Sequence, residues 1–91
     1  MTVLRIHHDV SDFDAWKWAF DRDPADRRGA GVQRYRVCRS ADFVTIDLEL
    51  PGRAEAEALL QKLQRLWAGP ARALTPQPQA WVLDEVEARA L

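Results

Sequence analysis

Hydrophobic and polar residues alternate along four segments of the chain, which is the pattern of strands with one buried face. The segments are residues 2–9, 32–39, 43–50 and 80–86. The third is the clearest, because its apolar face consists of Val44, Ile46, Leu48 and Leu50. Residues 40–42 have the length of a hairpin turn. We therefore predict four strands, of which the second and third form a β-hairpin.

A first helix is predicted between the first two strands. Its apolar stripe consists of Phe13, Trp16 and Phe20, spaced three and four residues apart. Ser11, followed three residues later by Asp14, resembles a capping box and predicts the start of the helix. Pro24 predicts an end just before it, because the residue preceding a proline avoids the helical conformation. Trp18 lies off the stripe, so we expect it outside the core, over the following loop or against a partner chain.

A second helix is predicted over residues 53–67, after the third strand. Its wide apolar stripe consists of Ala56, Leu59, Leu60, Leu63, Leu66 and Trp67. Gly69 and Pro70 form a stop signal, and residues 70–79 read as a loop. The helix therefore presents one long apolar face to the predicted sheet.

The order of these elements, β-α-β-β-α-β, is that of the ferredoxin-like α+β fold. We predict one domain over residues 1–91, with a four-stranded antiparallel-type sheet and both helices on one face. We expect the first and third strands to be parallel neighbours at the centre of the sheet.

The length of 91 residues limits the fraction of its surface that the chain can bury on folding. Cys38 is the only cysteine, so no intramolecular disulfide can form, and no Cys/His cluster has zinc-ligand spacing. We interpret Cys38 as a small apolar filler on a strand. We expect no bound metal and no cofactor. Pairing of two copies then remains as the way to complete a marginal core, and we predict a homodimer.

The charge pattern and hydropathy narrow the classes of partner. The net charge is -1, with arginines and carboxylates interspersed, so the basic surface expected of a nucleic-acid-binding protein is absent. The third strand would also repel phosphates through Asp47 and Glu49, unlike an RNA-recognition motif. No apolar run has the length of a membrane span, and no signal peptide is recognisable. We expect a soluble cytoplasmic protein that binds neither nucleic acid nor membrane.

Strand parity predicts a polar face on the side of the sheet away from the helices. If Leu4 and Ile6 pack under the helices, then Arg5 and His7 point the other way. The same parity places four residues of the third strand there: Phe43, Thr45, Asp47 and Glu49. The parity of the second strand is ambiguous, so its candidates for this face are Arg34, Tyr35 and Arg36.

Two interpretations of these charges stay open. In one, they form cross-strand ion pairs on a solvated face or at a wet dimer interface, worth about 0.2–1 kcal/mol each. In the other, a partner subunit encloses the face, and His7 forms a general acid/base pair with Asp47 or Glu49. An imidazole with its unperturbed pKa near 6.5, oriented by a carboxylate, suits proton transfer at neutral pH.

Residues 8–17, HDVSDFDAWK, resemble the opening of the small stand-alone dimeric α/β-barrel proteins related to the antibiotic-biosynthesis monooxygenases, many of them known only as proposed cyclases. The similarity covers about residues 4–86 and continues through Phe20-Asp21, Gly31-Val32, Tyr35-Arg36-Val37, Arg39 and Leu48-Glu49. One departure is the hairpin at residues 40–42, which is shorter than the Asp-Pro-Asn-type loop common in this group. If that loop shapes the rim of a pocket, the substrate of this protein differs from those of the related proteins.

The resemblance implies a homodimer whose two sheets close into a barrel. It implies a small apolar or aromatic molecule bound inside the barrel or in the cleft between sheet and helices. It also implies cofactor-independent chemistry: oxidation of quinol-like compounds by O2, or an aldol-type cyclisation. The residues that match the histidine and tryptophan of the group are His8 and Trp16, and parity turns His8 towards the helices.

The candidate site therefore includes residues indicated by the alternation along the strands and residues indicated by the family resemblance. The candidate catalytic residues are His7, His8 and Asp47, and the candidate substrate-binding residues are Arg5, Trp16, Arg36, Phe43 and Glu49. We predict a cofactor-independent cyclase, isomerase or monooxygenase acting on an apolar or aromatic natural-product intermediate. The alternative is a non-catalytic ligand-binding or structural barrel. An apolar cavity with an ionisable group at its wall would favour catalysis.

Overall fold

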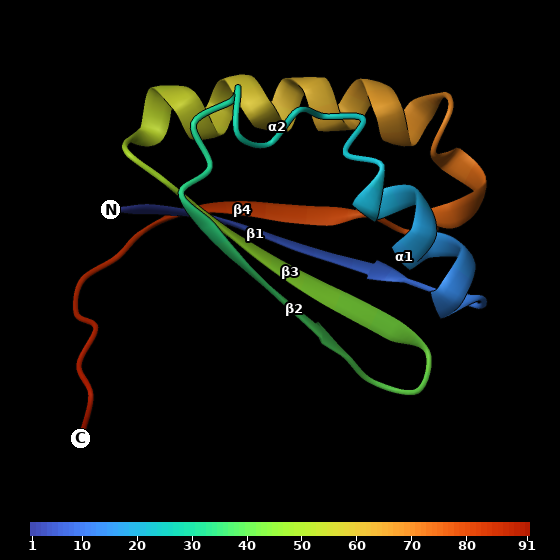
Figure 1. The fold of residues 1–91 in the computed structure, drawn as a ribbon, viewed down its shortest axis with the longest axis horizontal. Coiled ribbons are helices and arrows are strands. Elements are labelled where there is room, and N and C mark those ends of the chain that lie inside the picture. The colour runs from blue at the N-terminus through green and yellow to red at the C-terminus, as the bar shows by residue number, and fades with distance from the viewer.

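The sheet contains four antiparallel strands in the order β2-β3-β1-β4. A computed structural model describes residues 1–91, and Figure 1 shows both helices on one face of the sheet. The strands are β1 (Thr2–Asp9), β2 (Arg34–Arg39), β3 (Phe43–Leu50) and β4 (Gln79–Asp84). The helices are α1 (Phe13–Asp21), α2 (Arg53–Ala68) and the short 3₁₀ helix η1 (Arg72–Leu74). The predicted ferredoxin-like fold is confirmed.

The expected parallel pairing of the first and third strands is wrong. β1 and β3 are antiparallel neighbours, with Leu4 opposite Leu48 and Arg5 opposite Asp47. The α1 crossover brings β2 back in the direction of β1, and the hairpin then reverses the chain into β3, which lies between them. The predicted faces are unaffected, because side-chain alternation does not depend on strand direction.

The core lies between the sheet and the helices. Leu4 and Ile6 of β1 are buried there, together with the apolar face of β3, which consists of Val44, Ile46, Leu48 and Leu50. Ala56 and Leu59 of α2 and Trp16 of α1 close the core from above. The rest of the predicted α2 stripe, Trp67 included, is only partly buried. Helix α2 packs along the sheet, whereas α1 covers one end of it (Figure 1).

Helix α1 starts one residue later than the capping box suggested. Asp12 is the N-cap, and its carboxylate accepts a hydrogen bond of 3.0 Å from the backbone N–H of Ala15. Ser11 is exposed and makes no side-chain hydrogen bond that would cap the helix. The two residues are adjacent and both are good caps, so the sequence alone could not distinguish them.

Removal of the cap gives the first prediction. We expect Asp12→Ala to lower the free energy of unfolding by about 1 kcal/mol, because one N–H of the first turn loses its acceptor. Ser11→Ala is the matched control and should change it by less than about 0.5 kcal/mol. Urea unfolding followed by circular dichroism measures both. A larger loss for Ser11→Ala would contradict the observed cap.

Three strand ends differ from the predicted ones. β2 begins at Arg34 rather than at residue 32, and β4 covers Gln79–Asp84 rather than residues 80–86. Within β2, Arg34 and Arg36 face away from the helices, whereas Tyr35 faces them, opposite Leu48. Tyr35 packs edge-on against Phe20, with ring centroids 5.4 Å apart. The ambiguous parity of the second strand is thereby resolved.

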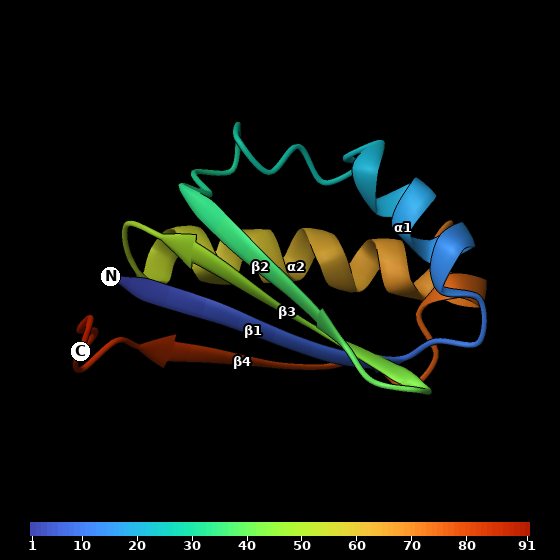
Figure 2. The same ribbon diagram turned by 60° about the horizontal axis from the view of Figure 1, so that its bottom comes forward.

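The face of the sheet opposite the helices is uncovered (Figure 2). Trp81 and Leu83 of β4 are exposed on it, beside Val3 and Arg5 of β1. Cys38 is also exposed there, so it does not fill the core of a single chain as predicted. We call this surface the open face. The last residues, 85–91, leave the sheet on the same side (Figure 1).

Candidate functional site

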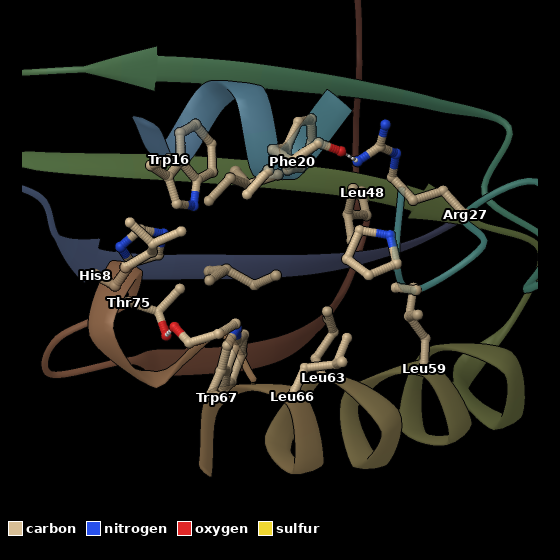
Figure 3. A pocket seen from close by; sticks show the side chains of 17 residues that line it. His8, Trp16, Phe20, Arg27, Leu48, Leu59, Leu63, Leu66, Trp67 and Thr75 are labelled. Carbon is tan, nitrogen blue, oxygen red and sulfur yellow. Dashed lines mark hydrogen bonds between the residues drawn. The ribbon is translucent and has the colours of Figure 1, made fainter. Parts of the chain in front are cut away.

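An apolar cavity of about 90 Å³ lies between the sheet and the two helices. Of the 17 residues that line it, 13 are hydrophobic, and they come from β1, β3, both helices and the segments that follow the helices. The larger ones are Ile6, Trp16, Phe20, Ile46, Leu48, Leu59, Leu63, Leu66, Trp67 and Leu74 (Figure 3). The only polar side chains in the lining are His8, Arg27 and Thr75. A small apolar molecule placed here would meet very few polar groups.

His8 lies at one end of this cavity, close to Trp16 and Thr75 (Figure 3). Its side chain sits on the helix-facing side of β1, and the residue is only 1% exposed. The Nδ1 atom lies 2.8 Å from the backbone carbonyl oxygen of Asp9, which can only accept, so Nδ1 carries the proton in the neutral ring. Nε2 then keeps its lone pair and makes no hydrogen bond within the chain. The ring meets Trp16 edge-on, with centroids 5.3 Å apart.

Burial decides the protonation state of His8. It lowers the pKa of the imidazole below its ordinary value of 6.5, and the nearby His7 lowers it further, against the opposing effect of the Asp9 carbonyl. The ring is therefore neutral at pH 7, with Nε2 as a free base at the wall of an apolar cavity. This is the arrangement of a general base that accepts a proton from a bound molecule.

The lowered pKa gives the second prediction. Because the unfolded chain binds a proton at His8 more readily than the folded chain, stability should fall as the pH drops below about 6.5. Above that value His8 is neutral in both states and adds no pH dependence. Urea unfolding between pH 7.5 and about 5 should show a shallower fall for His8→Asn than for the wild type. If the pH dependence of stability differed between His8→Asn and the wild type only above pH 7, the lowered pKa of His8 would be contradicted.

Arg27 and Thr75 were not among the sequence-based candidates. Arg27 belongs to the loop after α1, where no periodic pattern indicates which way a side chain points. Thr75 is buried, and its hydroxyl donates to the carbonyl oxygen of Ala71 at 2.8 Å, which closes the turn after η1. Thr75 lines the cavity beside His8, and Arg27 lines the opposite end (Figure 3).

Of the two interpretations of the open-face charges, the structure has the cross-strand ion pairs and no hydrogen bond between His7 and a carboxylate. Asp47 instead accepts two hydrogen bonds, of 2.9 and 3.0 Å, from the guanidinium of Arg5, which lies directly opposite. The hydrogen bond and the charge of Asp47 raise the pKa of Arg5. Glu49 pairs with Arg34 at 3.2 Å. Strand parity predicted the shared face correctly, but not that the two arginines take up both carboxylates.

His7 faces Thr45 on the open face and stacks on Phe43, with ring centroids 4.7 Å apart. Its Nδ1 atom is buried and has no hydrogen-bond partner. Arg36 is exposed opposite Asp47. Of the candidate residues, the structure therefore brings His8 and Trp16 together at the cavity. It places the other six on the far side of the sheet: Arg5, His7, Arg36, Phe43, Asp47 and Glu49.

No group of three or more His, Cys, Asp or Glu side chains is arranged to hold a metal ion. No helix is long and apolar enough to cross a membrane.

The comparisons with known proteins concern the fold. No protein-family model matches the sequence, and no curated protein matches it significantly. Solved structures do match. A protein from Nitrosomonas europaea assigned to the antibiotic biosynthesis monooxygenases has a TM-score of 0.70 at 14% identity, over 93% of this chain and 89% of that one. SnoaB from Streptomyces nogalater, a cofactor-independent oxygenase, has a TM-score of 0.65 at 17% identity, over 96% and 93%.

A third structure, a dimeric ferredoxin-like protein from an uncultured marine organism, has a TM-score of 0.66 at 6% identity, over 99% of this chain and 98% of that one. Identities this low carry information on the fold alone. The chain therefore has the ferredoxin-like fold of the antibiotic biosynthesis monooxygenase-like proteins, as the resemblance of residues 8–17 implied.

Proposed function

We propose that this protein is a monooxygenase-type enzyme that binds a small apolar or aromatic molecule in the cavity between sheet and helices. The observation that carries the proposal is the neutral imidazole of His8, which lines that cavity and whose Nε2 has no hydrogen-bond partner within the chain. Trp16 provides an aromatic surface beside it. The names of two structural neighbours, an antibiotic biosynthesis monooxygenase and a cofactor-independent oxygenase, support this class of activity.

The step assigned to His8 is the removal of a proton. Nε2 accepts the proton of an acidic C–H or O–H group, and the electron pair of that bond remains on the substrate as a carbanion, enolate or phenolate. Apolar surroundings keep water from competing for the base. In the monooxygenase reaction the anion then reacts with O2, and a CH2 group is converted overall to a carbonyl group with release of one water molecule.

The size of the cavity restricts the part of the substrate that is enclosed. Its volume of about 90 Å³ is below the roughly 150 Å³ of an apolar cavity that holds benzene. Even a single aromatic ring must therefore displace side chains of the lining or extend towards solvent, and a larger molecule must extend beyond the cavity. We assign the enclosed position to the ring that carries the acidic hydrogen.

We test this function with anthrone, an aromatic ketone with an acidic CH2 group. O2 consumption and the formation of anthraquinone are measured with and without the protein, and the uncatalysed oxidation is subtracted. Stoichiometric O2 uptake supports the monooxygenase. A cyclase would leave anthrone and O2 unchanged, yet would close a ring in a linear poly-β-ketone. A protein inert to both, but binding them, would be a ligand carrier.

We further propose that two copies of this single-domain chain pair through their open faces into a barrel. The dimeric ferredoxin-like neighbour supports this assembly, as does the exposure of Trp81 and Leu83 on a face that no element of the chain covers. In the dimer, the partner would cover His7, Phe43 and the Arg5–Asp47 pair. The open face then serves assembly, and the chemistry takes place on the helix side.

The dimer gives the third prediction. At micromolar concentration the wild type should sediment with twice the mass of the chain, because the open face buries apolar side chains on pairing. Leu83→Arg places an unpaired charge in that interface and should shift the protein to the monomer. Trp18→Arg, on the outer face of α1, is the control and should remain dimeric. A wild type that stays monomeric would contradict the proposed barrel.

A further inference from the structure

We propose that Arg27 is an oxyanion-binding residue of the cavity. Arg27 would hold an oxygen of the same molecule from which His8 removes a proton. This inference rests on the proposed function, because it assigns the second polar contact of the same substrate. His8 and Arg27 lie at opposite ends of the cavity, and apolar side chains separate them (Figure 3).

The guanidinium of Arg27 is held in place from three directions. One Nη1–H donates to the backbone carbonyl oxygen of Phe20 at 2.9 Å, and Nε lies 3.4 Å from the carboxylate of Asp23. The guanidinium also stacks over the ring of Phe20, 3.9 Å from its centroid, and lies 4.8 Å from that of Tyr35. A flexible side chain restrained in this way loses little entropy when it binds a ligand.

The backbone of Arg27 is restrained as well. Asp23 adopts a left-handed conformation, with φ of 56°, and its carboxylate accepts the backbone N–H of Arg27 at 3.0 Å. A left-handed aspartate is an uncommon conformation, which persists where the surrounding hydrogen bonds stabilise it. The turn therefore positions Arg27 against Phe20 at the edge of the cavity.

The chain does not use all the donors of Arg27. A guanidinium has five N–H groups, of which one pairs with Phe20 and one faces Asp23, so three have no partner in the chain. The side chain is only 15% exposed. Unpaired N–H groups of a permanent cation favour an anionic or strongly polarised oxygen, because the hydrogen bond is charge-assisted. Among the residues that line the cavity, Arg27 alone carries a permanent charge.

The positions of the two polar residues define the chemistry. When His8 removes a proton at one end of a conjugated ring, the electron pair of the C–H bond moves through the ring to the carbonyl oxygen at the other end. That oxygen becomes an enolate beside Arg27, and the proton resides on Nε2, so the charges balance. A preorganised cation at the position where charge develops stabilises the transition state. Arg27 would thus increase the acidity of the bound substrate.

The test uses 4-nitrophenol and nitrobenzene as probes, which have the same ring and nitro group and differ in the phenol oxygen. Quenching of the fluorescence of Trp16 and Trp67 reports binding, and the visible absorbance of nitrophenolate reports its ionisation. We expect the wild type to bind nitrophenolate about tenfold tighter than nitrobenzene, as one charge-assisted hydrogen bond provides. The apparent pKa of bound 4-nitrophenol should be lower than that of the free compound.

Variants distinguish the contribution of Arg27 to nitrophenolate binding from that of other residues. Arg27→Gln should remove the preference for nitrophenolate and the pKa shift, while the affinity for nitrobenzene stays within about twofold. Arg28→Gln, at the exposed neighbouring arginine, is the matched control and should behave as the wild type. Arg27→Lys keeps the charge and should retain part of the preference. Thermal melting of each variant verifies that it is folded.

The two proposals fail differently. If nitrobenzene does not bind to the wild type, the cavity is not a ligand site, and the proposed function is wrong together with this inference. If nitrobenzene binds but nitrophenolate shows no preference, only the role of Arg27 is wrong. The same conclusion follows if Arg27→Gln keeps the full preference.

Discussion

Replacing His8 with asparagine is expected to lower the rate of anthrone oxidation by about 10²–10⁴-fold, the usual cost of a lost general base. Asparagine can still donate to the carbonyl oxygen of Asp9, as Nδ1 does, but it has no basic atom in the place of Nε2. The binding of nitrobenzene, which has no acidic hydrogen, should change much less. Steady-state kinetics and fluorescence titration on the same preparation measure the two effects.

His7→Asn is the matched control for this experiment. His7 lies next in sequence on the same strand, but it faces Thr45 and stacks on Phe43 on the opposite side of the sheet. Its replacement should leave the rate per folded dimer within a few-fold of the wild type. If His7→Asn caused the larger loss of rate, the chemistry would lie on the open face, and the cavity would have no catalytic role.

Replacing Trp16 with alanine should have the largest effect on stability. Trp16 is 4% exposed and stacks on Phe20, with ring centroids 5.0 Å apart. It also contacts the rings of Phe13 and His8. Deletion of a buried aromatic side chain costs about 3–5 kcal/mol, since the cavity it leaves adds to the lost burial. For a domain of this length that is a large part of the total free energy of unfolding.

Trp18→Ala is the control for the tryptophan experiment. Trp18 lies on the same helix but is 65% exposed, with the guanidinium of Arg22 4.7 Å from its ring. Its replacement should change the free energy of unfolding by less than about 0.5–1 kcal/mol. Urea unfolding of both variants gives the comparison. Similar losses for Trp16 and Trp18 would mean that α1 does not pack as described.

The architecture could be predicted from the sequence because apolar residues alternate with polar ones in the strands and recur every three or four residues in the helices. β3 was predicted to the residue, since polar and apolar side chains alternate through all eight positions of Phe43–Leu50. The direction of β1 relative to β3 was predicted wrongly, although the crossover through α1 followed by the β2–β3 hairpin makes these two strands antiparallel. The start of α1 was misplaced by one residue because Ser11 and Asp12 are equally good caps.

The site could be predicted only in part. Parity and resemblance together placed His8 towards the helices near Trp16, where the structure has it. Parity could not show that Arg5 and Arg34 take up the carboxylates expected to orient His7, because cross-strand partners depend on register. Arg27 could not be found, because its position depends on a left-handed turn at Asp23 in a segment without periodicity.

The protonation state of His8 tests its assignment as the base of the cavity most directly. A long-range proton–nitrogen NMR spectrum of the histidine rings, recorded as a function of pH, reports both the tautomer and the pKa. We predict that His8 is neutral at pH 7, with the proton on Nδ1, and that its pKa lies below 6.5. We also predict that the Nε2 resonance shifts when nitrobenzene is added. An imidazolium at pH 7, or a neutral ring protonated at Nε2, would contradict the assignment of His8 as the base of the cavity.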